Sequence, residues 1–135
     1  QLADRMGKRL RADRRRAADR VEQIDRDVAR SRERITSAPV VIVVCLSTTG
    51  LDDHHERLMA IQSLAASIQN LLLTANEAGL GACWMAAPLY CPDVVREVLQ
   101  LPGDWDAQAL ITIGYPKDEG KRRERVDFRE ITLYR

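Results

Sequence analysis

Apolar residues recur at helical spacing through the middle of the chain and then give way to a short apolar run. Between Ser63 and Pro88 the apolar positions first return every three or four residues, which is typical of a helix. The pattern predicts a buried helix over Leu58–Ala78, ended by Gly79, because glycine adopts positive φ at little cost. The following run, Leu80–Met85, predicts a buried strand, and Pro88 ends it because proline cannot donate to a sheet ladder.

Two further runs predict strands that are buried on both faces. Val40–Leu46 and Ala109–Gly114 consist mainly of β-favouring residues and show no alternation of apolar and polar positions. Asp52 or Asp53 is suited to cap the helix that follows the first of these strands. The piece Ile131–Tyr134 at the end of the chain also has strand character. Together these elements predict an α+β fold, with a central sheet flanked by helices.

The first 35 residues combine high charge with an apolar seam. The segment between Gln1 and Ile35 contains twelve Lys or Arg and seven Asp or Glu. The seam has helical steps and predicts one helix face, formed by Leu2, Met6, Leu10, Ala17, Val21, Ile24, Val28 and Ile35. A basic arm for nucleic acid would cluster its cations, whereas here acids are interspersed. A solvated helix that packs on the domain or on a partner is therefore the favoured interpretation.

Composition narrows the class of protein further. A chain of 135 residues fits one domain, and a net charge of +1 argues against nucleic acid or an acidic membrane as the main partner. We find no apolar run near the ~18 residues that a membrane span needs, and no signal peptide. Cys45, Cys83 and Cys91 have no CxxC spacing, so we expect no metal site, reduced thiols and a cytoplasmic protein. His54 and His55 have no further ligand at metal spacing.

Several sequence motifs are similar to those of a known family. They lie in the segments Ile68–Leu73, Gly79–Trp84, Pro88–Arg96, Leu101–Trp105 and Ile113–Pro116. These motifs resemble the nitroreductase family, whose members hold FMN at a homodimer interface. The longer run is most similar to the nitroreductase-like C-terminal domain of the bacterial ligase that glutamylates the deazaflavin coenzyme, factor 420.

The resemblance implies a fold and a domain organisation. The expected fold is nitroreductase-like, with a mixed central sheet, and residues 1–135 would form a single such domain. Family members begin with an arginine-rich segment that grips the FMN phosphate. Because this segment does not occur here, we expect the domain to lack its N-terminal part.

The resemblance also implies which residues hold the flavin. Gly81 would lie beneath or beside the ring, and Pro88 and Leu89 would follow the ring edge. Proline has no N–H, so the donor to N5 would be the Leu89 amide, where many members carry Glu-Gly. Lys121 and Arg123 match the basic pair that binds the phosphate. No side chain is assigned a catalytic role, because the cofactor carries the hard chemistry in such enzymes.

The implied function is a two-step hydride transfer. NAD(P)H would reduce FMN, and the flavin would then reduce a small-molecule acceptor: a nitro compound, a quinone or an unsaturated intermediate. The alternative is a non-catalytic module that binds flavin or deazaflavin and serves an attached or partner enzyme. In either case we expect a homodimer, because the apolar central helix and the N-terminal seam need more cover than one small domain provides.

Overall fold

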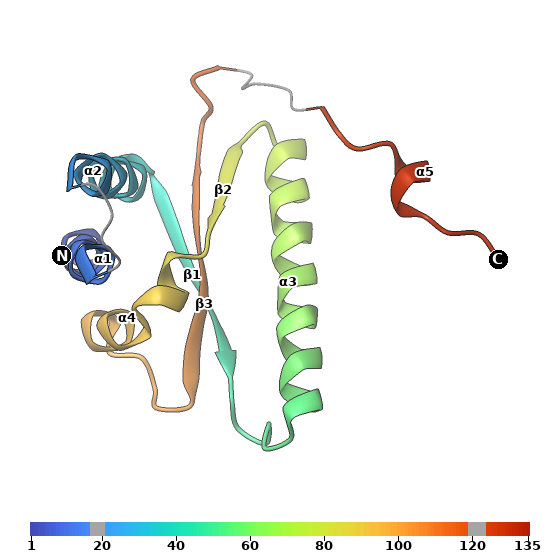
Figure 1. The fold of residues 1–135 in the computed structure, drawn as a ribbon, viewed down its shortest axis with the longest axis horizontal. Helices are drawn as coiled ribbons and strands as arrows, with labels where there is room; N and C mark the ends of the chain where they lie inside the picture. The colour runs from blue at the N-terminus through green and yellow to red at the C-terminus, as the bar shows by residue number, and fades with distance from the viewer. Residues whose placement is uncertain (17–20, 119–123) are drawn as a thin grey trace.

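Helices cover both faces of a three-stranded sheet (Figure 1). The computed structural model describes residues 1–16, 21–118 and 124–135. On one face lie α1 (Leu2–Arg16), α2 (Val21–Ser37) and α4 (Pro92–Leu99), and on the other lies α3 (His54–Glu77). This arrangement confirms the predicted α+β class.

The sheet has the last core strand at its centre. Its order is β1 (Val40–Ser47), β3 (Trp105–Gly114), β2 (Gly81–Met85), and both pairings are antiparallel. All three predicted strands are confirmed in position, although β3 begins four residues earlier than predicted. The predicted burial holds for β3 but not for β1 and β2, which are mostly half-buried in the single chain. The resemblance implies a mixed sheet, but the strand pairs in the described part of the chain include no parallel one.

The buried core divides into layers on the two faces of β3. Leu110 packs with Ala3 and Ile35 on the face covered by α1 and α2. Ile111, the next residue, packs with Ile68 of α3 on the opposite face. Since successive side chains of a strand point to opposite faces, one continuous apolar run can supply both layers. The absence of alternation in the sequence therefore has a direct structural cause.

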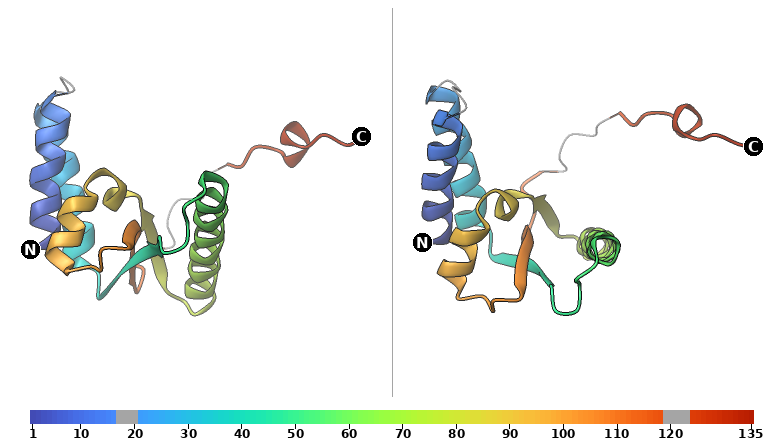
Figure 2. Two further views of the ribbon diagram at one scale, coloured as in Figure 1. Left: turned by 90° about the horizontal axis from the view of Figure 1, so that it is seen from below. Right: turned by 60° about the horizontal axis from the view of Figure 1, so that its bottom comes forward.

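The N-terminal seam belongs to two helices, so the prediction of one helix face is wrong. Helices α1 and α2 lie side by side (Figure 2), and the ion pair between Arg32 and Asp4 joins their ends across 2.6 Å. Gly7 allows close approach, since a Cβ there would lie 3.0 Å from Val28 Cγ1. The helical spacing of apolar residues continues across residues 17–20, which lie outside the described residues. The spacing therefore did not reveal that α1 and α2 are separate helices.

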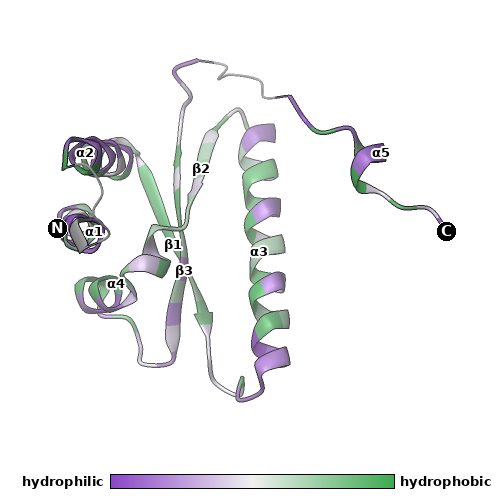
Figure 3. Cartoon of the chain, in the orientation of Figure 1, coloured by the Kyte–Doolittle hydropathy of each residue, from purple (hydrophilic) through white to green (hydrophobic). Residues whose placement is uncertain are grey.

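Helix α3 is capped as predicted, but this chain alone covers little of it. The carboxylate of Asp53 accepts the amide hydrogens of His55 and Glu56 at 2.7 and 3.1 Å. Only Ile68 and Ala75 of its residues are buried. Figure 3 shows apolar residues along the whole helix. Burial of α3 by a second copy of the chain stays a prediction.

The same helix is long and apolar enough, by length and composition alone, to cross a membrane. This differs from the expectation above, because the polar residues of residues 58–76 interrupt the apolar run without adding a charge. Helices in the core of soluble proteins have the same properties, so length and composition do not separate the two cases.

The remaining elements are short. The 3₁₀ helix η1 (Ala87–Tyr90) follows β2, and α4 then starts with Pro92 in its first turn, as predicted. The tail contains α5 (Phe128–Ile131), so part of the predicted strand-like piece is helical. Residues 124–135 are exposed throughout, including the side chains of Phe128, Ile131, Leu133 and Tyr134.

Gly114 has no side chain, which lets Pro39 in the connection between α2 and β1 lie close to β3. This close contact leads to a prediction about stability. A Cβ on Gly114 would lie 2.7 Å from Cδ of Pro39, which is closer than atoms pack. We expect Gly114→Ala to lower the free energy of unfolding by about 1–3 kcal/mol, the usual cost of overpacking. Gly103→Ala is the matched control, because a Cβ there meets nothing within 4 Å. Equal thermal unfolding midpoints of the two variants would contradict this.

Candidate functional site

The candidate site begins at strand β2. Among the described residues β2 pairs only with β3, so its other edge presents unpaired backbone groups. A cavity of about 460 Å³ lies at the start of this strand, where Gly81 pairs with Gly114. Such volumes are typical of small-molecule sites. The helix end at Arg34–Ser37 and the segment Tyr115–Lys117 complete its wall.

Gly81, the first predicted cofactor residue, lines this cavity. A Cβ on Gly81 would meet Pro116 Cβ at 3.5 Å and the Gly114 carbonyl oxygen at 3.6 Å, which are ordinary van der Waals distances. Its φ is not in the positive range that favours glycine. The fold therefore tolerates a side chain at position 81, and what the glycine provides is space at the cavity floor.

Pro88 and Leu89 lie in η1, directly after β2. Pro88 is fully buried, whereas about half of the Leu89 side chain is exposed. The Leu89 amide donates a hydrogen bond to the Ala86 carbonyl at 3.1 Å. Any bond from this amide to a flavin would have to share that hydrogen or replace the internal bond. The cofactor contacts of both residues stay predictions.

Two aromatic residues near this edge were not singled out by the sequence. Trp84 in β2 is 42% exposed and Tyr90 at the end of η1 is 73% exposed. Trp84 pairs with Ile111, whose side chain packs against α3, whereas Tyr90 lines the cavity beside α1, so the two rings do not form one surface. Large aromatic side chains inside an apolar run were a usable signal, because they are rarely left exposed without a partner.

The predicted phosphate ligands, Lys121 and Arg123, lie outside the described residues. Described cations near the same end of the sheet are Arg34 and Lys117, both of which line the 460 Å³ cavity. The space at Gly81, the open strand edge and the exposed apolar side chains are compatible with a bound flavin. These residues could hold its ring, while its phosphate needs cations such as those of the tail.

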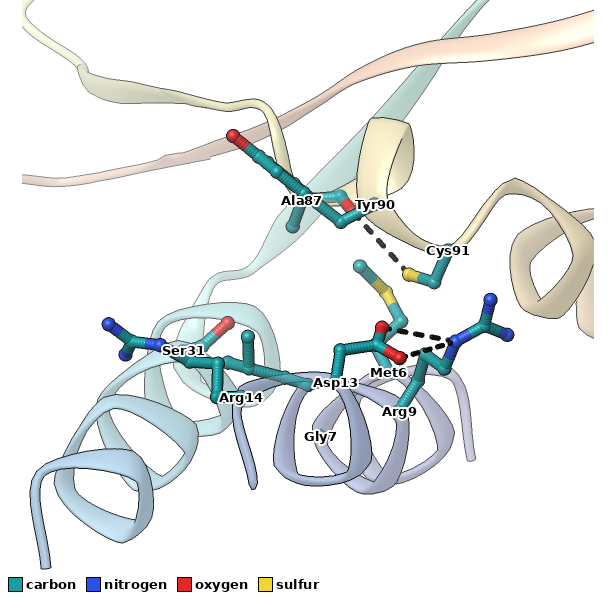
Figure 4. Close-up of a pocket in the computed structure, with 10 residues that line it drawn as sticks. Met6, Gly7, Arg9, Asp13, Arg14, Ser31, Ala87, Tyr90 and Cys91 are labelled. Carbon is teal, nitrogen blue, oxygen red and sulfur yellow. Dashed lines mark hydrogen bonds and ion pairs between the residues drawn. The ribbon is translucent and has the colours of Figure 1, made fainter. Parts of the chain in front are cut away.

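A second cavity, of about 550 Å³, lies between the α1–α2 pair and η1 (Figure 4). Met6, Leu10 and Ala87 give it apolar walls. At its rim the Asp13 carboxylate accepts from Nε of Arg9 at 3.1 Å. Cys91 lies at one side and donates to the Ala87 carbonyl at 3.4 Å.

The thiols of Cys45 and Cys91 are not activated as nucleophiles. Burial raises the pKa of Cys91, and the neighbouring Asp93 raises it further. Burial is also the main cause that raises the pKa of Cys45. Thiols with raised pKa values stay protonated and react slowly. The described residues contain no group of three His, Cys, Asp or Glu side chains that could hold a metal ion.

Ion pairs attach α1 to α4 beside the second cavity, and they make stability depend on pH. Arg9 contacts Asp93 at 2.7 Å and Arg5 contacts Glu97 at 2.5 Å. These hydrogen bonds lower the pKa of both carboxyl groups in the folded protein. A lowered folded pKa adds stability above the unfolded value, about 4, which is lost as pH falls through the folded value.

We therefore expect an unfolding midpoint that changes little between pH 7 and pH 5 and falls once the pH drops below about 4. The measurement is thermal unfolding across this range. The double variant Asp93→Asn/Glu97→Gln should show a shallower acid loss than the unchanged chain. An identical acid profile in this variant would show that the pairs do not carry the effect.

The sequence and the fold were compared with those of known proteins. The profile described as "Nitroreductase family" matches residues 1–115. Iodotyrosine deiodinase of Drosophila melanogaster is 33% identical over 93 residues, covering 64% of this chain and 31% of that protein. Two solved structures are similar in fold.

One of them is the NfrA1 nitroreductase from B. subtilis, with a TM-score of 0.70 and 18% identity, covering 76% of this chain and 48% of that one. The other is an FMN-dependent nitroreductase from Clostridium difficile, with a TM-score of 0.58 and 23% identity, covering 73% and 58% of the two chains. The chain spans 31% of the length of this deiodinase, and 49% and 51% of the length of two other curated relatives.

Proposed function

Because the chain belongs to the nitroreductase family, we propose that it works as the core of an FMN-dependent NAD(P)H oxidoreductase that reduces a small-molecule acceptor. The open edge of β2, with space at Gly81 and an exposed Trp84 on the strand, is the observation that supports this function most. It offers an apolar surface beside unpaired backbone groups, as a flavin ring requires. The acceptor would be a nitro compound, a quinone or another unsaturated molecule.

The residues of this chain would bind and orient the cofactor. When bound, FMN supplies the hydride chemistry and accepts and returns two electrons. Gly81 would leave room for the ring, and the exposed side chains at the end of β2 would exclude water from one side of it. Backbone N–H groups along the β2 edge would donate to the polar rim of the ring. The cations Lys121 and Arg123 would neutralise the phosphate.

The proposed active form is a homodimer in the cytoplasm. Helix α3 exposes Leu58, Met59 and Leu73, and the tail exposes Phe128 and Tyr134. A second copy that covers these side chains would remove a large apolar surface from water. The three cysteines are free, which suits a reducing compartment. We expect an interface above about 1,600 Å², the size of a standard specific interface.

The proposal is tested by the absorbance of the purified protein after incubation with FMN. We expect the bands of oxidised flavin to appear and to disappear under anaerobic conditions when NADH or NADPH is added. Addition of a nitroaromatic or a quinone should then restore them. A protein that takes up no FMN would contradict the function, and so would a bound flavin that neither nicotinamide reduces.

The alternative function is a non-catalytic module that binds flavin or deazaflavin (factor 420) and serves an attached or partner enzyme. One observation favours it: the Leu89 amide already donates to Ala86, and Pro88 is buried. A flavin held without an amide donor at N5 would be less well tuned for hydride transfer. Tight binding of factor 420 or FMN without reduction by NAD(P)H would support this alternative.

The phosphate assignment gives a separate prediction. Each charge-assisted hydrogen bond contributes about 1.5–3 kcal/mol. We therefore expect Lys121→Ala/Arg123→Ala to weaken FMN binding by about a hundredfold or more, measured by fluorescence quenching of the flavin. Arg125→Ala is the control, because it removes a nearby exposed cation of the same tail. Unchanged FMN affinity in the double variant would reject the assignment.

A further inference from the structure

The cavity of about 550 Å³ between the α1–α2 pair and η1 is separate from the cavity at Gly81. The described residues that line the two cavities have no member in common. The cavity at Gly81 belongs to the proposed flavin site, whereas the larger one has no part in the proposed function. Its volume lies in the range that is typical of small-molecule sites, about 300–1,000 Å³. Protein interiors are otherwise close-packed, so a space of this size is suited to a ligand.

The walls of this cavity favour an aromatic molecule. Met6 and Cys91 are 6% and 4% exposed, and they place two sulfur atoms at the wall, beside the half-buried Leu10. Sulfur makes favourable contacts with aromatic rings. Tyr90 lies in η1, across the cavity from α1 (Figure 4), and its ring can pack against a second ring. An aromatic ring between α1 and η1 therefore gains contacts that a saturated ring of the same shape does not.

The charged residues at the rim are engaged in ion pairs. The described lining contains three of them, Arg9, Asp13 and Arg14. Nε of Arg9 is 3.1 Å from the Asp13 carboxylate, and Nη1 of Arg9 is 2.7 Å from that of Asp93. Arg14 is paired with Asp27. An anion would meet the two carboxylates beside Arg9, and a cation would have to displace an arginine from its partner. The rim therefore disfavours a charged ligand.

Neutral polar groups are available for one end of the ligand. Ser31, half-buried in α2, and Tyr90 line the cavity, and their hydroxyl groups can both donate and accept hydrogen bonds. Sγ of Cys91 donates to the Ala87 carbonyl oxygen at 3.4 Å. Burial raises the pKa of Cys91, so this thiol stays protonated and adds no charge. These groups suit a hydroxyl or carbonyl group on the ligand.

We propose that this cavity is a second binding site, which takes a neutral aromatic molecule with one hydroxyl or carbonyl group. The ring packs between Met6 and Tyr90, and the polar atom bonds the Ser31 hydroxyl. A bound ligand joins the α1–α2 pair to η1. The inference does not depend on the proposed function, because the cavity is not used by the flavin.

The first test is calorimetry of naphthalene probes with the full chain at pH 7, with and without FMN. We expect neutral 2-naphthol to bind at least tenfold more tightly than the anion 2-naphthoate or the cation 2-naphthylmethylammonium. Its saturated analogue, decahydro-2-naphthol, should bind about threefold more weakly or worse. Saturating FMN should leave the affinity for 2-naphthol unchanged. Displacement of 2-naphthol by FMN would overturn the inference, and so would equal binding of the neutral and charged probes.

The second test locates 2-naphthol by NMR on the unchanged chain. We expect nuclear Overhauser contacts from the probe to the methyl groups of Met6 and Ala87, which both line the cavity. Met59 provides the control methyl group, because it is 67% exposed on α3, on the other face of the sheet. Contacts to Met59 without contacts to Met6 would assign the probe to the exposed face of α3 and overturn the inference.

The third test fills the cavity. We expect Ser31→Leu to weaken binding of 2-naphthol at least tenfold while the circular dichroism spectrum stays unchanged. Thr36→Leu is the matched control, because Thr36 is an exposed residue of the same helix outside the cavity lining. Equal affinities of the two variants for 2-naphthol would contradict the site. Where Ser31→Leu fails to fold, the contacts to Met6 in the unchanged chain decide the question.

These outcomes are separate from failure of the proposed function. A chain that binds 2-naphthol at Met6 but takes up no FMN would support this site and contradict the function. A flavoprotein that NAD(P)H reduces, but in which 2-naphthol makes no contact with Met6, would support the function and contradict the site.

Discussion

Replacing Leu73 by aspartate is expected to convert the homodimer into a monomer and to release its flavin. Leu73 is 59% exposed in the single chain, on a helix of which only two residues are buried. If a second copy covers this face, Leu73→Asp places an unpaired charge in the interface, at a cost of about 3–5 kcal/mol. That cost weakens dimerisation by at least a hundredfold. Sedimentation at micromolar concentration, with absorbance read at a flavin band, measures both effects together.

The control for this experiment is Val21→Asp. Val21 is also an exposed aliphatic residue, but it lies at the start of α2, on the other face of the sheet. An acidic residue in the first turn of a helix is favourable, so we expect an unchanged dimer. A Leu73→Asp protein that sediments as a flavin-loaded dimer would show that the α3 face is not the interface.

Shortening one of two adjacent side chains in β3 is expected to loosen the packing on only one face of the sheet. Which face is loosened depends on which of the two residues is changed. Leu110 and Ile111 are both fully buried. Leu110→Ala removes contacts to the layer of Ala3 and Ile35, and Ile111→Ala removes contacts to the layer of Ile68. Each should cost about 2–5 kcal/mol of unfolding free energy, as large-to-small core changes do.

Hydrogen exchange distinguishes the two variants. We expect Leu110→Ala to speed exchange mainly in α1 and α2, and Ile111→Ala mainly in α3. Leu99→Ala is the control, because Leu99 is partly exposed at the end of α4 and should cost much less. Identical exchange maps for the two core variants would contradict the assignment of the layers.

The strands were predicted best from the sequence, because an uninterrupted run of apolar residues indicates a strand with helices on both of its faces. Apolar runs without alternation identified β1, β2 and β3, because helices lie on both faces of the sheet, although only β3 is largely buried and β1 and β2 are mostly half-buried. The start of β3 was missed, since Asp106 interrupts the run. Its carboxylate is paired with Arg57 at 2.5 Å and Arg96 at 3.0 Å, and a single sequence does not reveal such partners.

Other features depend on contacts that periodicity does not encode. The helical period of the first 35 residues is the same for one long helix as for α1 and α2 side by side. In the candidate site, small residues at Gly81 and Gly114 were visible, but the cavity arises only when α2 ends against β3. Arg34 and Thr112 lie far apart in the sequence and share no motif. The cavity could therefore not be predicted from the sequence, because the fold brings together residues that are distant in the chain.

The central position of β3 has a consequence for synthesis of the protein. Val40 pairs with Ile113, and Met85 pairs with Leu110, so neither edge strand has a partner until the last core strand is made. The α1–α2 pair joins residues that are near in sequence and can form early, whereas closure of the sheet must wait for the ribosome to release β3. During that interval β1, β2 and the uncharged part of α3 are exposed together, and they are the segments that a chaperone would bind on the nascent chain.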